Sequence, residues 1–285
     1  MSGRKDGSPE AHYLLGHTDH ELQRLDLQGE IYHSVTRRAL EAGGIREGSR
    51  VLDIGCGTGD VSLAVAERVG PSGQVLGIDR GEAAVSTAQR KFEQLGVTHA
   101  RFEQHELDAF DADEPFDAVV GRFILMHQPD PAATLAAVSR SVRPGGTVIM
   151  IESWMNALRG SSHSYPHSRF YDGIVEWKSR VVEGAGADLD AGGRLRATYR
   201  TAGIEHVETW LEALVAGERE SPYYAYVEQS VRSMLPEAAR QGLGGFDDDS
   251  TTGIAERLRN EVDDAAGALV AWPVVVAVGR VAEAG

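Results

Sequence analysis

The stretch Val51–Asp60, VLDIGCGTGD, decides the fold. It begins with a short apolar run, contains glycines at positions 55, 57 and 59, and leads into the helix-like stretch Val61–Val69. A chain that passes from a strand into a helix over so few residues must turn tightly. Glycine permits both the turn and the close approach of a ligand to the backbone, which a Cβ would obstruct. The stretch therefore predicts a strand, a ligand-binding loop and a helix.

Five short apolar runs of this kind alternate with helical stretches. They are Arg50–Ile54, Val75–Asp79, Ala100–Phe102, Phe116–Phe123 and Thr147–Ile151. Strands that alternate with helices form a parallel sheet with helices on both faces. Since the crossovers between parallel strands are right-handed, the pattern predicts a doubly wound α/β fold.

The chain after residue 151 predicts two more strands and a helical insert. The strand-like runs His206–Val215 and Trp272–Val281 are expected to form a final antiparallel pair. This pair would complete a mostly parallel, Rossmann-like sheet of seven strands. The helical patterns Tyr223–Arg240 and Thr252–Ala266 lie between the two runs. We therefore expect a helical lid inserted before the last strand, where it could cover a pocket.

Composition excludes several classes of protein. The 285 residues have a net charge of −15, and 42% of them are hydrophobic. This hydrophobic fraction is typical of a globular protein, and the negative charge repels phosphate backbones, so we expect no nucleic-acid partner. The single cysteine, Cys56, forbids an internal disulfide and a thiolate metal cluster. A polar start and the lack of a long apolar stretch predict a cytoplasmic protein without a membrane partner.

Three acidic residues discriminate between the cofactors that such a loop can bind. A dinucleotide site requires a third glycine at position 60, where this chain has Asp60, and a pyrophosphate there would also face Asp53. Asp79 ends the second apolar run, where a carboxylate can accept both ribose hydroxyls of a nucleoside. A nicotinamide dinucleotide site and a purely structural glycine turn are the alternatives.

These residues, with RPGG at 143–146 and GRFILMHQPDP at 121–131, resemble the class I S-adenosylmethionine-dependent methyltransferases. The resemblance covers residues 20–155 and is greatest to the ubiquinone/menaquinone-methyltransferase-like group of small-molecule enzymes. It implies three parts of the chain. Residues 1–45 would be an N-terminal tail with capping helices, residues 46–155 the cofactor-binding core, and residues 156–285 an acceptor-binding lid with the final strand pair.

The resemblance also implies which residues bind S-adenosylmethionine. They are Gln28, Tyr32, Asp53, Gly55, Gly57, Asp60, Asp79, Arg80, Glu106, Leu107, Gly121 and Arg122. In this set, Asp79 would hold the ribose and Arg80 would lie beside the adenine. An acid after the third strand would bind the adenine amino group; Glu106 is the aligned residue and Asp108 the alternative.

Methyl transfer from a sulfonium is an in-line displacement, which requires orientation and, for an oxygen or nitrogen acceptor, a base. It requires no metal, and no ligand spacing in the sequence argues for one. We expect catalytic roles for His163 and His167, which follow the fifth strand, and for Glu152, which ends it. The alternatives are lid histidines without such a role and a carboxylate that anchors a loop. His127 is expected on the cofactor side or in a structural role.

The resulting hypothesis is methyl transfer from S-adenosylmethionine to a small hydrophobic or aromatic acceptor, with O-methylation slightly favoured. The high Ala, Gly and Arg content favours bacterial secondary metabolism. One alternative is a C-methyltransferase of a prenyl or aromatic acceptor. Another is a methyltransferase-like cyclase that binds S-adenosylmethionine without methyl transfer. The sequence leaves homo-oligomerisation open.

Overall fold

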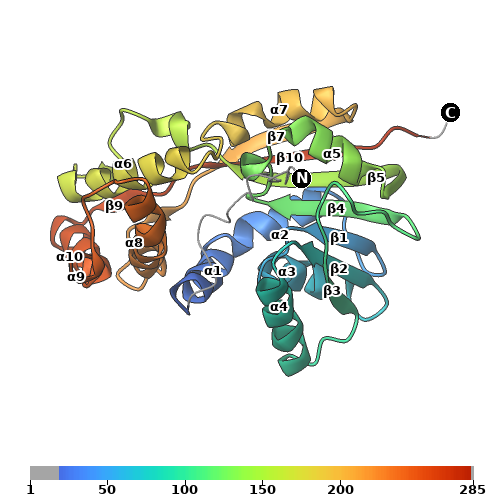
Figure 1. Cartoon of the computed structure of the whole chain (residues 1–285), viewed down its shortest axis with the longest axis horizontal. Coiled ribbons are helices and arrows are strands. Elements are labelled where there is room, and N and C mark those ends of the chain that lie inside the picture. The colour runs from blue at the N-terminus through green and yellow to red at the C-terminus, as the bar shows by residue number, and fades with distance from the viewer. Residues whose placement is uncertain (1–18, 284–285) are drawn as a thin grey trace, which may run out of the picture.

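A seven-stranded sheet with strand order β3-β2-β1-β4-β5-β10-β7 forms the centre of the molecule (Figure 1). The computed structural model describes residues 19–283, so the tail at residues 1–18 lies outside the described part. The first five strands pair in parallel, and β10 is antiparallel to both β5 and β7. The expected doubly wound, mostly parallel Rossmann-like sheet is confirmed.

The inner strands of the sheet coincide with apolar runs of the sequence, because both of their faces are buried, whereas the edge strand Glu205–Glu212 is mostly exposed. The strands of the sheet are β1 (Arg50–Ile54), β2 (Gln74–Asp79), β3 (Ala100–Gln104), β4 (Phe116–Arg122), β5 (Val142–Ser153), β7 (Glu205–Glu212) and β10 (Val274–Arg280). Strand β5 is longer than the expected run Thr147–Ile151 and includes RPGG. The pairing with β4 shifts there, from Phe116 opposite Val142 to Ala118 opposite Thr147, and Gly145 has a φ of 71°, so the RPGG segment bulges out of the ladder. Gly145 donates to the carbonyl of Val281 at 3.1 Å and Val281 donates to that of Gly146 at 2.9 Å, which holds this segment in place.

Helices cover both faces of the sheet, each over its own apolar core. One face carries α2 (His33–Ala42), α3 (Asp60–Val69) and α4 (Glu82–Gln94), and the other carries α5 (Pro131–Ser139) and α7 (Ala191–Thr201). The first core contains Val65 and Phe92, and the second contains Leu135 and Tyr199, all at most 1% exposed. Alternate side chains along each strand enter one core or the other, as the pleat of a strand requires.

A second group of helices lies beyond the carboxyl end of the parallel strands and forms the lid (Figure 1). It consists of α1 (Asp19–Ile31), α6 (Arg169–Gly184), α8 (Tyr223–Arg240), α9 (Asp248–Thr251) and α10 (Ile254–Ala265). Short strands β6 (Ser164–Tyr165), β8 (Val215–Ala216) and β9 (Ala268–Val270) join these helices in a small antiparallel sheet. The lid comes from three stretches of chain, since α6 precedes α7 and β7, whereas α8 to α10 follow them.

Two short 3-10 helices, η1 (Leu125–His127) and η2 (Met155–Leu158), follow β4 and β5 and connect the sheet to the lid. The N-terminal apolar pattern is divided at Tyr32 into α1 and α2. None of the helices in residues 19–283 combines the length and the apolar character needed to cross a membrane.

Candidate active site

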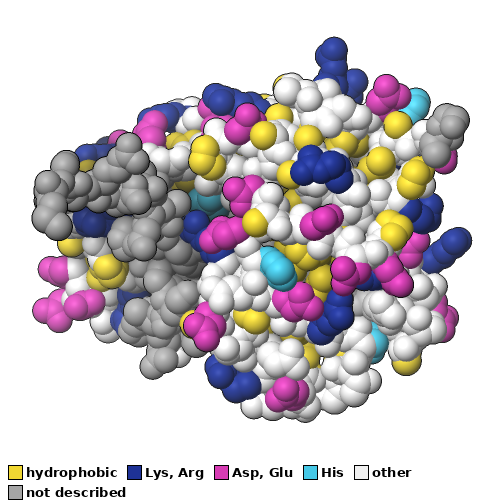
Figure 2. Space-filling view, turned by 45° about the vertical axis from the view of Figure 1, so that its right-hand side comes forward, with side chains coloured by type: hydrophobic (Ala, Val, Ile, Leu, Met, Phe, Trp, Pro, Cys, Tyr) yellow, Lys and Arg dark blue, Asp and Glu magenta, His cyan; other side chains and the backbone are white. Residues whose placement is uncertain are grey.

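A cavity of about 1340 Å³ lies between the carboxyl ends of the parallel strands and the lid. In open α/β sheets, ligands bind at this edge. Its core side is formed by the loops after β1, β2, β3 and β4, and its lid side by α1, α6, α8 and the segment before β10. Outside the cavity, acidic and basic side chains are interspersed over the face drawn in Figure 2.

The glycine loop after β1 borders the cavity with left-handed backbone. Gly55, Gly57 and Gly59 have φ angles of 62°, 52° and 86°. A Cβ on Gly55 would lie 2.0 Å from Cδ1 of Ile124, and one on Gly59 would lie 3.0 Å from Cε2 of Phe92. A Cβ on Gly57 would meet no protein atom within 4 Å. The loop therefore packs its flanking glycines against the protein and leaves the central one open to a ligand.

The carboxylate of Asp79 is fixed by two backbone amides. Its Oδ2 accepts the N–H of Gly57 at 3.0 Å, and its Oδ1 accepts the N–H of Gly81 at 2.8 Å. Asp79 also lines the cavity. Because a carboxylate oxygen can accept more than one hydrogen bond, both oxygens keep capacity for ligand hydroxyls.

Ten of the twelve residues expected at the cofactor line this cavity. They are Gln28, Tyr32, Gly55, Gly57, Asp60, Asp79, Arg80, Glu106, Leu107 and Arg122. Asp108 lines it as well, so both acids considered for the adenine contact border the same space.

The other two expected residues, Asp53 and Gly121, lie behind the cavity wall. Asp53 is 1% exposed and accepts the hydroxyl of Ser62 at 2.5 Å, and burial raises its pKa to about 7. A Cβ on Gly121 would lie 2.9 Å from Cγ1 of Ile54 and 3.0 Å from Sδ of Met150. These two residues hold the start of α3 and the interior of the sheet in place.

Arg122, at the end of β4, places a partly buried cation beside the glycine loop. Its Nη1 donates to the hydroxyl of Thr36 at 3.1 Å, and its guanidinium lies 6.0 Å from the ring centres of Tyr32 and Phe123. Burial lowers its pKa, while the neighbouring Asp60 and Asp53 oppose that shift. A partly buried guanidinium with few partners is suited to bind a carboxylate of a ligand.

Helix α1 closes over the loop because Gly29 faces Asp60. A Cβ on Gly29 would lie 2.6 Å from Cγ of Asp60. The same aspartate accepts a hydrogen bond from Nζ of Lys91 at 2.6 Å. One turn earlier on α1, Arg24 donates to the side chain of Gln28 at 2.6 Å, and both residues line the cavity.

Glu152 does not line the cavity; it anchors the chain after β4. Its side chain accepts the backbone N–H groups of Ile124 at 2.9 Å, Leu125 at 2.7 Å and Met126 at 3.4 Å. It is fully buried, and burial raises its pKa to about 7. The structure therefore places Glu152 as a loop anchor, away from the position expected of a catalytic carboxylate.

His163 and His167 are also kept away from the cavity, by the small sheet and by Asp172. The backbone of His163 donates to Oδ1 of Asp172 at 3.0 Å, and its carbonyl accepts the N–H of Val270 at 2.7 Å. The ring of His167 pairs with Asp172 at 2.8 Å and is 57% exposed. Neither ring borders the cavity, because pairing of β6 with β9 holds this segment on the outer part of the lid.

His127 borders the cavity, on the cofactor side where it was expected. The structure adds lining residues that the sequence did not single out. Lys178, Tyr226 and Trp272 border the cavity from the lid. Lys178 did give a signal, since it interrupts the apolar stripe of α6 at helical spacing from Ile174 and Val182.

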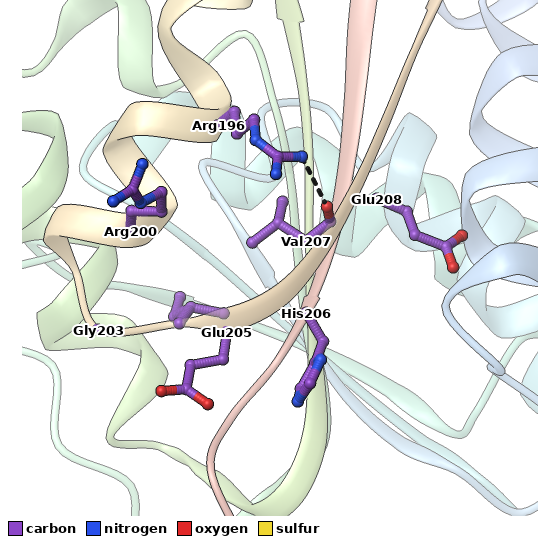
Figure 3. A pocket seen from close by; sticks show the side chains of 8 residues that line it. Arg196, Arg200, Gly203, Glu205, His206, Val207 and Glu208 are labelled. Atoms are coloured by element: carbon purple, nitrogen blue, oxygen red, sulfur yellow. Dashed lines mark hydrogen bonds between the residues drawn. The ribbon is translucent and has the colours of Figure 1, made fainter.

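A smaller hollow of about 570 Å³ lies between α7 and the start of β7 (Figure 3). Arg196 donates to the carbonyl of Val207 across it at 3.4 Å, whereas Glu205, His206 and Glu208 do not converge on a common point. Arg280 of β10 pairs with Thr147 of β5 on one side and with Glu205 of β7 on the other, so the start of β7 lies level with Thr147. The hollow is thus at the amino end of the sheet, opposite the large cavity.

Comparisons with known proteins agree with this geometry. A family model described as a methyltransferase domain matches residues 45–212, more than half of the chain. A demethylmenaquinone methyltransferase of Staphylococcus aureus is 29% identical over 161 residues, which cover 54% of this chain and 64% of that relative. The match thus spans less than two thirds of the relative's length.

Two solved structures show the same fold at low identity. The YcgJ protein of Bacillus subtilis has a TM-score of 0.58 at 16% identity and covers 88% of this chain and 100% of its own. Phosphoethanolamine N-methyltransferase 2 of Haemonchus contortus, in complex with S-adenosyl-L-methionine, has a TM-score of 0.57 at 16% identity, with 97% and 61% covered. Because the family model matches most of the core and the sheet has the expected topology, this chain belongs to the methyltransferase-domain family, with the class I fold of S-adenosylmethionine-dependent methyltransferases.

Proposed function

We propose that this protein transfers a methyl group from S-adenosylmethionine to a small, largely apolar acceptor. The observation that carries the proposal is the Asp79–Gly57 arrangement: an anchored carboxylate and an open glycine backbone face one cavity. A nucleoside with an amino-acid tail requires both of these, the carboxylate for its ribose and the bare backbone for its methionine part.

The lining residues suit the parts of this cofactor. Asp79 would accept the ribose hydroxyls, and Glu106 or Asp108 the adenine amino group, with Arg80 beside the ring. Gly55 and Gly57 would lie against the methionine part. The bound cofactor supplies an electrophilic methyl group on a sulfonium.

Two cationic or aromatic groups would position the reacting end. Arg122 would bind the methionine carboxylate, supported by Gln28 from α1. Tyr32 packs edge-on against Phe123, with ring centres 5.2 Å apart, and borders the cavity. Its ring would stabilise the sulfonium, by an interaction of about 0.5–2 kcal/mol.

The lid side of the cavity is the proposed acceptor site. Its lining includes the apolar side chains of Met155, Val182, Met234 and Trp272, beside polar ones such as Lys178 and Tyr226. Mostly apolar walls with a few polar groups are typical of small-molecule sites. These walls support a hydrophobic or aromatic acceptor, with O-methylation favoured. We also propose a cytoplasmic location, which the single cysteine supports.

Titration calorimetry with S-adenosylhomocysteine and, separately, NADH tests the cofactor assignment. We expect S-adenosylhomocysteine to bind and NADH to give no heat of binding. Tight binding of NADH, or no binding of S-adenosylhomocysteine by the folded protein, would overturn the proposal. Incubation with methyl-labelled S-adenosylmethionine and a panel of phenols, amines and prenyl compounds then separates a methyltransferase from a protein that binds the cofactor without transfer.

A further inference from the structure

Lys178 is a buried cationic side chain on the lid side of the cavity. It lies on α6, is 4% exposed and lines the cavity. Its Nζ is 4.8 Å from the ring centre of Trp272 and 5.3 Å from that of Tyr226. The amine is therefore held between two aromatic side chains that reach it from distant parts of the chain.

No carboxylate compensates this buried amine within residues 19–283. None of the ion pairs there involves Lys178, and the charged group that acts on it is the like-charged Arg24 of α1. Burial, and to a smaller extent Arg24, lower the pKa of Lys178 to about 7. A polar atom of a ligand in the cavity would satisfy the amine.

The use of lysine at this position is itself informative. The chain has only three lysines, at positions 5, 91 and 178, among its 28 basic residues. An arginine remains protonated in proteins, whereas a buried lysine can lose its proton near neutral pH. On the apolar stripe of α6, an aliphatic residue would pack without the cost of burying an amine.

The lid side offers few other groups able to accept a proton. Its titratable residues at the cavity are Arg24 and Tyr32 from the N-terminal helices, Lys178, and Tyr226 and Arg240 from α8. Arginine and tyrosine side chains are in general protonated near neutral pH. The acidic lining residues and the two lining histidines, His105 and His127, lie on the core loops, and Glu152, His163 and His167 lie outside the cavity.

We propose that Lys178 is the general base for an acceptor that carries a weakly acidic hydroxyl on a flat ring or enol, and thus that the protein is an O-methyltransferase. This inference rests on the proposed methyl transfer. The neutral amine takes the hydroxyl proton, and the oxygen forms a bond to the methyl carbon. The carbon–sulfur bond breaks with its electron pair left on sulfur, and S-adenosylhomocysteine and a methyl ether result. The ammonium then releases its proton to solvent.

The surroundings match this step. A phenol with an ordinary pKa of about 10 is within reach of an amine base that titrates near neutrality. The rings of Trp272 and Tyr226 stabilise the ammonium once it has formed. Flat apolar walls would orient the ring of the acceptor.

The test uses 3-nitrophenol, whose phenolate absorbs visible light and which is mostly protonated in free solution near pH 7.5. We expect wild-type protein with S-adenosylhomocysteine to bind it as phenolate, with the proton kept on Lys178 and none released to buffer. Lys178→Met should bind the neutral phenol. Lys178→Arg, already charged, should release one proton per phenolate bound, which calorimetry in buffers of different ionisation enthalpy measures.

Methyl transfer to 3-nitrophenol from labelled S-adenosylmethionine gives the kinetic test. We expect Lys178→Met to lose at least about 100-fold in kcat, and the wild-type rate to rise as the pH passes through about 7. Arg180→Met, which removes a cation from the exposed side of the same helix, is the matched control and should retain both rate and pH profile.

Affinity for S-adenosylhomocysteine separates the two proposals and reports on folding. It should change by less than about twofold in every variant. If the wild type binds S-adenosylhomocysteine but takes up 3-nitrophenol as the neutral phenol or not at all, the role of Lys178 is overturned and the proposed function stands. Full transfer by Lys178→Met would overturn it as well. If S-adenosylhomocysteine does not bind the wild type, the proposed function itself fails.

Discussion

The carboxylate of Asp79 accepts the backbone N–H of Gly57 at 3.0 Å and so connects the end of β2 to the glycine loop after β1. Residues 22 positions apart are joined in this way at the mouth of the cavity. The bond fixes the carboxylate and the loop relative to one another, so a ligand meets a preformed acceptor.

Asp79→Ala should weaken the binding of S-adenosylhomocysteine by about 1–3 kcal/mol, because charge-assisted hydrogen bonds to the ribose are lost. Titration calorimetry measures the change. Asp113→Ala removes an exposed acid of the same core and should leave the affinity unchanged. Equal affinity in wild type and Asp79→Ala would mean that the ribose lies elsewhere.

Gly57→Ala should lose both stability and cofactor affinity. An alanine at a φ of 52° costs about 1–2 kcal/mol in the free energy of unfolding, and its Cβ would project into open cavity space. Gly96→Ala is the matched control, since Gly96 has a φ of 67°, no atom within 4 Å and a position outside the cavity. Chemical denaturation should show similar losses for both, and calorimetry with S-adenosylhomocysteine a loss for Gly57→Ala alone. Unimpaired binding by Gly57→Ala would argue against a ligand at this loop.

Gly29→Ala should push α1 away from Asp60 and weaken S-adenosylhomocysteine binding, because its Cβ would lie 2.6 Å from Cγ of that residue. The same contact should lower the free energy of unfolding. Helix propensity alone predicts the opposite, a gain of about 0.5–1 kcal/mol when alanine replaces glycine in a helix. Gly173→Ala in α6, where a Cβ meets nothing within 4 Å, should show that gain. Thermal unfolding of both variants distinguishes the effect of the contact with Asp60 from that of helix propensity. A Gly29→Ala variant that is stabilised and binds S-adenosylhomocysteine with full affinity would contradict the close approach of α1 to Asp60.

Stability should fall as the pH rises from about 4.5 to 7, in part because of Glu152. Burial raises its pKa from 4.5 to about 7, so the folded state holds a proton that the unfolded chain has released. The stability that this difference in pKa contributes is fully present below the pKa of Glu152 in the unfolded chain and is lost as the pH rises through its pKa in the folded state. The free energy of unfolding should change by an amount on the order of 3 kcal/mol over this range.

Glu152→Gln, which does not titrate, should flatten this dependence in urea denaturation at several pH values. Asp53, whose pKa burial also raises to about 7, keeps part of the slope. Glu114→Gln is the control, because the side chain of Glu114 is 79% exposed. An unchanged slope in Glu152→Gln would show that its carboxyl is ionised throughout this range.

The sequence by itself determined the cofactor half of the molecule. The stretch Val51–Asp60 predicts its own strand, loop and helix because the positive φ angles of its glycines are a local property. Apolar runs that alternate with helical patterns predict the parallel sheet with helices on both faces, since burial on both faces requires such runs. The position of Asp79 at the ligand-binding edge could be predicted because it is the last residue of a strand.

Only the tertiary structure decided the acceptor half. Glu152 faces three backbone amides rather than the cavity, and pairing of β6 with β9 holds His163 away from it. Lys178 contacts the rings of Tyr226, which belongs to α8, and of Trp272, which lies in the segment before β10. The burial of a side chain and the groups it meets depend on how segments far apart in the chain pack together. That packing is fixed by the whole lid and not by the spacing of residues within any one segment.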